Sequence, residues 1–165
     1  MALRAPYLCL WYNQTAEDAA QRYMSVLPDS RIVSVDRAPA DNPSTSEGKV
    51  LTVTMDLMGT RLMMLNGGDV FKQSEAASLV VECETQDEID ALWDGLIAGG
   101  GAESQCGWLK DPWGVSWQIT PRMLIDIMSS GDQPVARAVF EEMMTMRKID
   151  IARLEAAATR ARSSA

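Results

Sequence analysis

The stretch from Cys106 to Pro121, CGWLKDPWGVSWQITP, holds many of the side chains in this chain that could do chemistry. It contains three of the five tryptophans, one of the three cysteines, and a glutamine, Gln118, in the middle of a strand-like run. The chain has no histidine, which removes histidine general bases, Ser-His-Asp and Cys-His catalysis, and every metal cage that needs imidazole. Any reaction chemistry must therefore come from carboxylates, Tyr, Cys, Lys, Arg or amides.

Three side chains are candidates for metal-free chemistry. For Cys106, only Lys110 is close enough in sequence to lower the thiol pKa, and this favours a buried structural cysteine over a nucleophile. Glu82 lies beside Cys83 in a strand-like run; a solvated strand edge is the first interpretation, and a base pointing into a pocket is the alternative. Tyr12 is the third candidate, as a phenol at the end of a buried strand.

The glycine clusters do not predict a nucleotide site. Gly99-Gly100-Gly101 follows a predicted helix, whereas a nucleotide-binding glycine loop follows a strand and opens a helix. Asn66-Gly67-Gly68 is a strand exit and not a phosphate cradle. No S-adenosylmethionine fingerprint is present, and 165 residues leave no room for a separate Rossmann-like domain.

Composition bounds the class of protein. The net charge is −8 and there is no long basic run, so we expect no nucleic-acid partner and no anionic membrane surface. No apolar run reaches the roughly 18 residues of a membrane span, and no signal peptide is predicted. Three cysteines without CxxC spacing suit reduced thiols, which predicts a cytoplasmic protein.

The chain shows the same order of predicted elements twice. In the first half we expect a strand over 7–12, a helix over 15–27, and three strands over 30–37, 49–57 and 61–66. A loop over 38–48 separates the first two of these three strands. In the second half the pattern recurs over 77–84, 85–98, 102–110 and 115–120, and residues 122–158 are predicted to be helical. Thr15 and Thr85 are the predicted helix N-caps.

Sliding the chain against itself supports an internal repeat. At an offset of 70 residues, Thr15 falls on Thr85 and Tyr23 on Trp93. At an offset of 55 residues, Asp56–Gly59 falls on Asp111–Gly114, and each turn precedes a final strand. Two registers in one chain favour a duplicated βαβββ module.

This pattern resembles the vicinal oxygen chelate superfamily of glyoxalase I, bleomycin-resistance proteins and extradiol dioxygenases. It is most similar to the PhnB-like family, whose members often carry the label 3-demethylubiquinone-9 3-methyltransferase. The resemblance rests on the stretches LWYNQTAEDAAQRYMSVLPDSRI, LNGG, CETQDEIDALWDGL, CGWLKDPWGVSWQITP and MMTMRKIDIARLEAA. It implies an α+β fold in which modules of about 7–66 and 77–121 form a cupped mixed sheet, giving a domain over 1–121 and a C-terminal helical extension over 122–165.

The resemblance also implies where a metal would sit. Members of the superfamily hold it with two side chains from each module, on the first and last strands. The repeat places these positions at Leu8, Met63, Ser78 and Gln118, of which only Gln118 is a good oxygen ligand. A divalent cation prefers charged or imidazole donors. We therefore predict that the metal site has been lost and that no cofactor is bound.

What remains is a cup lined by apolar, aromatic and a few polar side chains. Strand alternation puts Ser116, Gln118 and Thr120 on one face, and by the same parity Cys106 and Trp108 share a face. Trp108, Trp113 and Trp117 are interpreted first as core and turn packing; alternatively, one or two line a pocket for a planar apolar ligand that Gln118 orients. The predicted ligand-binding residues are Leu8, Tyr12, Met63, Ser78, Glu82, Cys106, Trp108, Ser116 and Gln118.

The first functional hypothesis is a homodimeric, metal-free protein that binds a small hydrophobic or aromatic molecule. An enzyme is the alternative, either a metal-dependent lyase or dioxygenase with an altered cage, or a metal-free one that uses Glu82 or Tyr12. The methyltransferase activity in the family label is a third possibility, against which the missing S-adenosylmethionine fingerprint counts.

Overall fold

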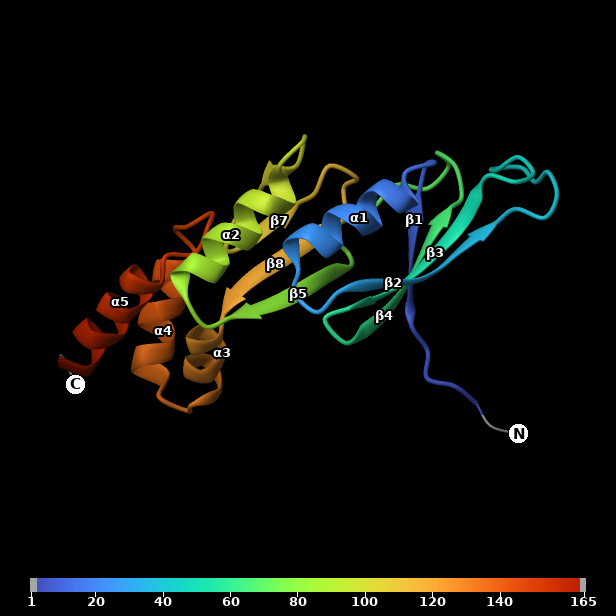
Figure 1. Cartoon of the computed structure of the whole chain (residues 1–165). Helices are drawn as coiled ribbons and strands as arrows, with labels where there is room; N and C mark the ends of the chain where they lie inside the picture. The colour runs from blue at the N-terminus through green and yellow to red at the C-terminus, as the bar shows by residue number, and fades with distance from the viewer. Residues whose placement is uncertain (1–2, 164–165) are drawn as a thin grey trace. The chain divides into compact units, whose positions relative to one another are not determined.

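The computed structural model describes residues 3–163, and the chain divides into two compact units on either side of the Gln73–Ser74 bond (Figure 1). The N-terminal unit contains β1 (Leu8–Tyr12), α1 (Ala16–Val26), β2 (Arg31–Arg37), β3 (Val50–Leu57) and β4 (Thr60–Asn66). The C-terminal unit contains β5 (Ser78–Cys83), α2 (Gln86–Ile97), β6 (Ala102–Glu103), β7 (Trp108–Lys110), β8 (Ser116–Pro121), α3 (Arg122–Ser129), α4 (Gln133–Met143) and α5 (Ile151–Ser163).

Both units carry a four-stranded mixed sheet with the same topology. The strand order is β1-β4-β3-β2 in the first sheet and β5-β8-β7-β6 in the second. In each sheet the first and last strands of the module pair in parallel and the remaining pairs are antiparallel. This confirms the predicted α+β fold of two βαβββ modules followed by C-terminal helices.

Each sheet buries one face against the helix of its own module. On α1 the buried side chains are Ala16, Ala19, Ala20 and Tyr23, and on α2 they are Ile89, Leu92, Trp93 and Leu96. The strands bury alternate side chains, such as Leu62 and Met64 on β4. Burying each large apolar side chain contributes roughly 1.5–3 kcal/mol, so these two helix–sheet layers form stabilising apolar cores in the modules.

The two helices begin in different ways. Thr85 forms the predicted cap: its hydroxyl accepts from the backbone N–H of Glu88, and the Glu88 carboxylate accepts from the backbone N–H of Thr85. Thr15 makes no side-chain cap bond. Instead, the backbone N–H of Ala16 donates to Asn66 Oδ1 at 3.0 Å, so β4 supplies the acceptor that α1 lacks.

Asn66 also fastens the 38–48 loop. Its Nδ2 donates to the Val50 carbonyl at 2.9 Å. The backbone carbonyl of Asn66 accepts from the hydroxyls of Thr45 at 2.9 Å and Ser44 at 3.1 Å. Asn66 is 2% exposed, and every polar group of its side chain has a partner within the unit. Through its side-chain amide and its backbone carbonyl, Asn66 of β4 therefore joins α1, β3 and the loop.

The turn between β7 and β8 is organised by a buried carboxylate. Asp111 is 3% exposed. Its Oδ1 accepts from the backbone N–H groups of Trp113 at 2.9 Å and Val115 at 3.0 Å, and its Oδ2 accepts from the indole N–H of Trp117 at 3.1 Å. Because Trp117 is fully buried on the α2 side of the sheet, this carboxylate joins the turn to the core.

The predicted strand over 102–110 is wrong in one respect, because it is broken into β6 and β7. Cys106 and Gly107 have left-handed backbones, with φ of 57° and 83°. Their N–H groups donate to the carbonyls of Met146 at 2.8 Å and Arg147 at 2.7 Å, in the segment that connects α4 to α5. The N–H groups that would pair within a continuous strand therefore bond to the segment between α4 and α5 instead.

The helices α3, α4 and α5 lie side by side after β8 (Figure 1). Their shared core consists of Leu124, Val135, Val139, Met146, Ile149, Leu154, Ala157 and Ala158. Gln86 of α2 holds them at one end, because its amide donates to the Ile149 carbonyl at 3.1 Å and accepts from the Ile151 N–H at 2.9 Å.

The predicted domain boundary at residue 121 stays a prediction. Within residues 3–163, no helix has the length and apolar character needed to cross a membrane.

Replacing Asp111 by alanine is expected to destabilise the C-terminal unit by about 3 kcal/mol, because the donors from Trp113, Val115 and Trp117 lose their acceptor, and the last two of these bonds are buried. Urea unfolding followed by tryptophan fluorescence measures this directly, since four of the five tryptophans lie after Ser74. Asp126→Ala is the matched control: it removes an exposed carboxylate from α3 and is expected to change stability by less than about 0.5 kcal/mol. Equal midpoints for the two variants would contradict the role given to Asp111.

The three cysteines are expected to differ in reactivity. Burial, assisted by the nearby Glu88 carboxylate, raises the pKa of the Cys83 thiol to about 11, so at about pH 8 the reactive thiolate is scarce. Ellman's reagent should therefore label exposed Cys9 and partly exposed Cys106 in the folded protein, and Cys83 only after unfolding. Cys83→Ala should leave the native thiol count unchanged; a native count that falls in this variant would contradict the burial.

Candidate functional site

The face of each sheet opposite α1 or α2, called here the far face, carries most of the predicted site residues. Successive strand residues alternate between faces, so the pairing register decides which side chains gather there. In the C-terminal sheet, the far face carries Ser78, Val80 and Glu82 of β5, Trp108 and Lys110 of β7, and Ser116, Gln118 and Thr120 of β8. Five predicted residues, namely Ser78, Glu82, Trp108, Ser116 and Gln118, therefore share one face.

Gln118 occupies the middle of this face. Its register partners are Val80 on one side and Trp108 on the other. Its Nε2 donates to Ser78 Oγ at 2.9 Å, which fixes the amide in one orientation. The arrangement is a neutral polar group held between an exposed aliphatic side chain and a partly buried indole.

Ser116 pairs in register with Ser78 on β5 and with Lys110 on β7. It is 1% exposed, and within residues 3–163 its Oγ has no hydrogen-bond partner. A buried hydroxyl without a partner costs about 1–3 kcal/mol relative to one that is satisfied. This atom is the strongest local indication that a further polar group belongs at the site.

The charged side chains of this face are already paired. Glu82 is exposed and forms an ion pair with Arg122 of α3, with 3.4 Å between Oε2 and Nη1. Lys110 forms an ion pair with Glu75, which precedes β5. The Lys110 ammonium lowers the pKa of the Glu75 carboxyl, mainly through their hydrogen bond. The middle of the face is therefore left to the uncharged side chains.

The far face of the N-terminal sheet has a different character. Met63 lies between Cys9 of β1 and Thr54 of β3, and the next row holds Trp11 and Leu65. Toward the other end, Asp56 forms ion pairs with Arg31 at 2.7 Å and Arg61 at 2.5 Å. Hydrogen bonds from Arg61 and then Arg31 lower the pKa of the Asp56 carboxyl. The surface is apolar and sulfur-rich at one end and ionic at the other.

Leu8 lies on the opposite side from Met63. Its register partner is Leu62, so the structure brings Cys9 next to Met63. The reason is a difference of one residue between the modules: Tyr12 and Thr15 enclose two residues, whereas Cys83 and Thr85 enclose one. The extra residue is absorbed at Gln14, where φ is 59°. A prediction that counts residues back from the helix therefore misplaces β1 by one residue, and a shift of one residue exchanges the two faces of a strand.

Tyr12 and Cys106 are also away from the far faces. Tyr12 is 3% exposed, and its hydroxyl lies 3.1 Å from that of Tyr23 on α1, so it belongs to the helix side of the sheet. Cys106 lies outside β7, and its thiol lies 3.5 Å from the Met144 sulfur. The parity that would place it with Trp108 does not hold, because the chain leaves the strand conformation at Cys106.

Trp11 is a far-face residue that the sequence reasoning missed. Its indole N–H donates to the Gly68 carbonyl at 2.9 Å, and its ring meets Phe71 edge to face with 5.0 Å between centroids. A Cβ at Gly67 would lie 2.2 Å from the ring, so only glycine allows this position. Phe71 is 64% exposed. The Asn-Gly-Gly exit of β4 was the available signal, since glycine there indicates a close approach.

The side chains at the superfamily's metal positions do not fit a divalent cation. The resemblance implied Leu8, Met63, Ser78 and Gln118; in the structure Cys9 takes the place of Leu8 beside Met63, and Ser78 accepts a hydrogen bond from Gln118. These side chains include no carboxylate and no imidazole, the donors that a divalent cation prefers. In the described part of the chain, no three Cys, Asp or Glu side chains converge as a metal site would require.

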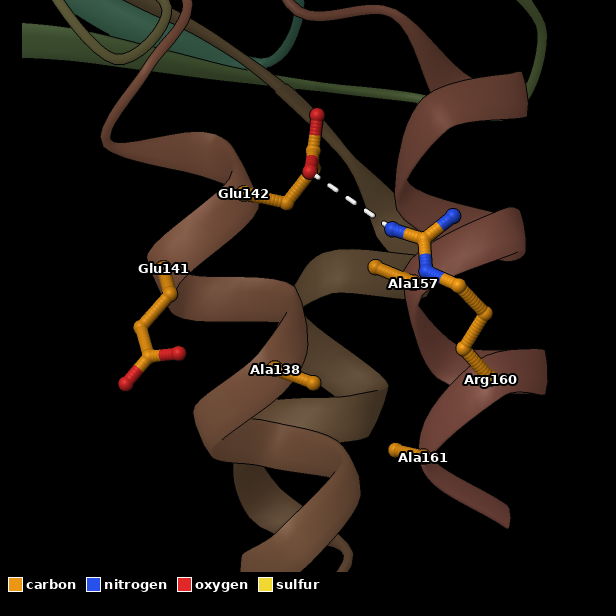
Figure 2. A pocket seen from close by; sticks show the side chains of 6 residues that line it. All are labelled: Ala138, Glu141, Glu142, Ala157, Arg160 and Ala161. Atoms are coloured by element: carbon orange, nitrogen blue, oxygen red, sulfur yellow. Dashed lines mark ion pairs between the residues drawn. The ribbon is translucent and has the colours of Figure 1, made fainter. Parts of the chain in front are cut away.

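A groove of about 400 Å³ lies between α4 and α5, away from all predicted site residues (Figure 2). Figure 2 shows Ala138, Ala157 and Ala161 between the two helices and Glu142 pointing toward Arg160. The Glu142–Arg160 ion pair measures 3.7 Å, and Arg153 binds the same carboxylate at 2.5 Å. The small side chains and paired charges indicate helix packing.

Comparisons with known proteins agree with this fold. The family model described as 3-demethylubiquinone-9 3-methyltransferase matches residues 5–120. Among solved structures, a PhnB protein from Bacillus cereus, described under the same methyltransferase name, is 33% identical over 72% of this chain and 99% of that chain, with a TM-score of 0.64. Protein PA1353 from Pseudomonas aeruginosa is 16% identical over 73% of this chain and 98% of that chain, with a TM-score of 0.58.

A glyoxalase/bleomycin resistance protein from Albidiferax ferrireducens is 16% identical over 70% of this chain and 96% of that chain, with a TM-score of 0.48. No curated protein matches the chain. The family model covers both βαβββ modules, and the Bacillus cereus protein aligns over nearly its whole length. The chain therefore belongs to the PhnB-like, 3-demethylubiquinone-9 3-methyltransferase family.

Proposed function

We propose that this protein binds a small hydrophobic or aromatic molecule on the far faces of its sheets, without a metal ion. The observation that carries this proposal is the row Val80–Gln118–Trp108, in which a fixed amide lies between apolar side chains. Sites for small molecules combine apolar and aromatic walls with a few well-placed polar groups, and this row has that composition. Trp108 offers ring surface, and Gln118 offers a carbonyl oxygen for orientation.

The donor chemistry favours binding over the metal-assisted reactions of the superfamily. A metal that polarises a substrate needs ligands that hold it against water, and a thioether, a hydroxyl and a neutral amide without any carboxylate or imidazole are poor ligands for such an ion. A metal-dependent lyase or dioxygenase with an altered cage is the alternative. For a metal-free enzyme, Glu82 is the better-placed base, although Arg122 holds it as an ion pair.

The Bacillus cereus relative carries a methyltransferase name, and transfer of a methyl group is a further alternative for this chain. The glycine clusters count against it. The Trp11 ring occupies the space beside Gly67, and Gly101 lies against Ile97 of the preceding helix. Neither cluster therefore forms the strand–loop–helix cradle that nucleotide-like cofactors use.

A homodimer is part of the proposal. The C-terminal helices expose Met128, Phe140 and Met144, which are 39%, 48% and 54% exposed. Methionine is an adaptable apolar side chain that suits surfaces between subunits. A second copy of the chain is the occupant that we propose for this surface.

Binding is expected to depend on Trp108 and Gln118. The neutral aromatic fluorophore N-phenyl-1-naphthylamine should gain fluorescence in a saturable titration, and Trp108→Ala and Gln118→Ala should each weaken its affinity about tenfold, or roughly 1.4 kcal/mol. Met24→Ala, which removes an exposed apolar side chain from α1, is the matched control and should titrate like the unmodified protein. Equal titrations for all three variants would place any binding elsewhere.

Native mass spectrometry of an untagged protein tests the assembly and the metal together. A tag must be avoided, because it would add the imidazoles that this chain lacks. The expected species is a dimer with the mass of two bare chains, and added S-adenosylmethionine should produce no adduct. A stoichiometric divalent ion that is lost in Gln118→Ala would overturn the metal-free proposal and favour the lyase or dioxygenase alternative.

A further inference from the structure

The most informative unexplained atom in the molecule is the Ser116 hydroxyl. It is buried, and within the described residues it lacks a partner, although it lies on the same face as Gln118. Native proteins satisfy most buried polar atoms, and an exception needs an explanation such as a bound water or a ligand. The turn beside it satisfies its own polar groups, because Asp111 accepts from Trp113, Val115 and Trp117.

The neighbour of Ser116 decides what could satisfy it. Ser78 is its register partner on β5, and adjacent strands lie about 4.8 Å apart. The Ser78 oxygen accepts from Gln118 Nε2 at 2.9 Å, so its own proton is left to donate. Ser116 can donate as well. Two hydroxyl donors that are side by side can be satisfied together by one oxygen with two lone pairs, as in a carbonyl group.

The charges around the pair select a neutral acceptor. Lys110, the other register partner of Ser116, forms an ion pair with Glu75, and that pair carries no net charge. A carboxylate or phosphate would have to compete with Glu75 for the ammonium group. A ketone, quinone or amide oxygen needs only the two hydroxyls, and an attached ring would reach Trp108, which lies next to Gln118 on the same face.

We infer that Ser116 and Ser78 bind the carbonyl oxygen of a neutral aromatic ligand whose ring lies against Trp108. This inference rests on the proposed binding function and adds the chemical class of the ligand. It assigns Gln118 a positioning role, since its amide holds the Ser78 hydroxyl in the orientation that donates. It also accounts for the Ser116 hydroxyl, which has no hydrogen-bond partner among the described residues.

Two probes of equal shape test the inference. 2-Acetylnaphthalene carries a carbonyl oxygen where 2-isopropenylnaphthalene carries a =CH2 group, and each would compete against N-phenyl-1-naphthylamine on the full chain. The unmodified protein should prefer the ketone by about five- to tenfold, and Ser116→Ala should abolish this preference with little effect on the hydrocarbon. Thr120→Val is the matched control, because it removes a hydroxyl from the same face of the same strand and should keep the preference.

Thermal unfolding without a probe supplies the second readout. If a ligand is the missing partner, Ser116→Ala should raise the melting temperature of the free protein by about 2 °C, because it removes an unsatisfied buried group. A lowered melting temperature would show that a structural water satisfies Ser116, and would overturn the inference. Binding of both probes with no preference would overturn it too, and would leave the binding function intact. No competition by either probe, with no fluorescence gain in the direct titration, would overturn both.

Discussion

The Asp111 carboxylate is the interaction on which the C-terminal site depends. It holds the β7–β8 turn by two backbone N–H groups and the buried Trp117 by its indole N–H. Fixing Trp117 on the α2 side of the sheet decides the face of every other residue on β8, because alternation then turns Ser116 and Gln118 to the far face. A residue that reads as simple turn chemistry therefore sets the register of the candidate site.

Much of the fold could be predicted, because the signals are local and occur twice. The Thr85–Glu88 capping box, the Asp111–Gly114 turn and the alternation on β8 each follow from neighbouring residues. The faces of β1 could not be predicted by counting from the helix. The modules differ by one residue between strand and helix, absorbed by a left-handed Gln14, and a difference of one residue exchanges the faces of a strand.

Other misses came from contacts between residues that are far apart in sequence. Gly107 is a local signal for a break beside Cys106, but the partners that hold the break are the carbonyls of Met146 and Arg147, 40 positions further along in each case. Likewise, Thr15 matches the local cap pattern but makes no side-chain cap bond, and the first N–H group of α1, from Ala16, donates to Asn66 of β4. Local preferences give way where a tertiary partner is better placed.

The duplicated modules keep the backbone and change the chemistry of the far faces. Met63 and Gln118 occupy matching places on β4 and β8, yet one lies beside a thiol and the other beside an indole and a serine. A shared fold does not impose a shared function, and here the side chains of one strand pair carry the difference. The N-terminal face offers apolar and sulfur contacts, and the C-terminal face offers directional hydrogen bonds.

The contrast between two buried residues of one hairpin sharpens this point. Asp111 and Ser116 are both almost fully buried; the carboxylate has three partners, whereas the hydroxyl has none within the described residues. If stability alone had set this hairpin, alanine would serve better at position 116, because it removes the unsatisfied atom and keeps the strand. The hairpin satisfies one buried polar group fully and leaves the other without a partner among residues 3–163, which is the arrangement that the proposed binding role requires.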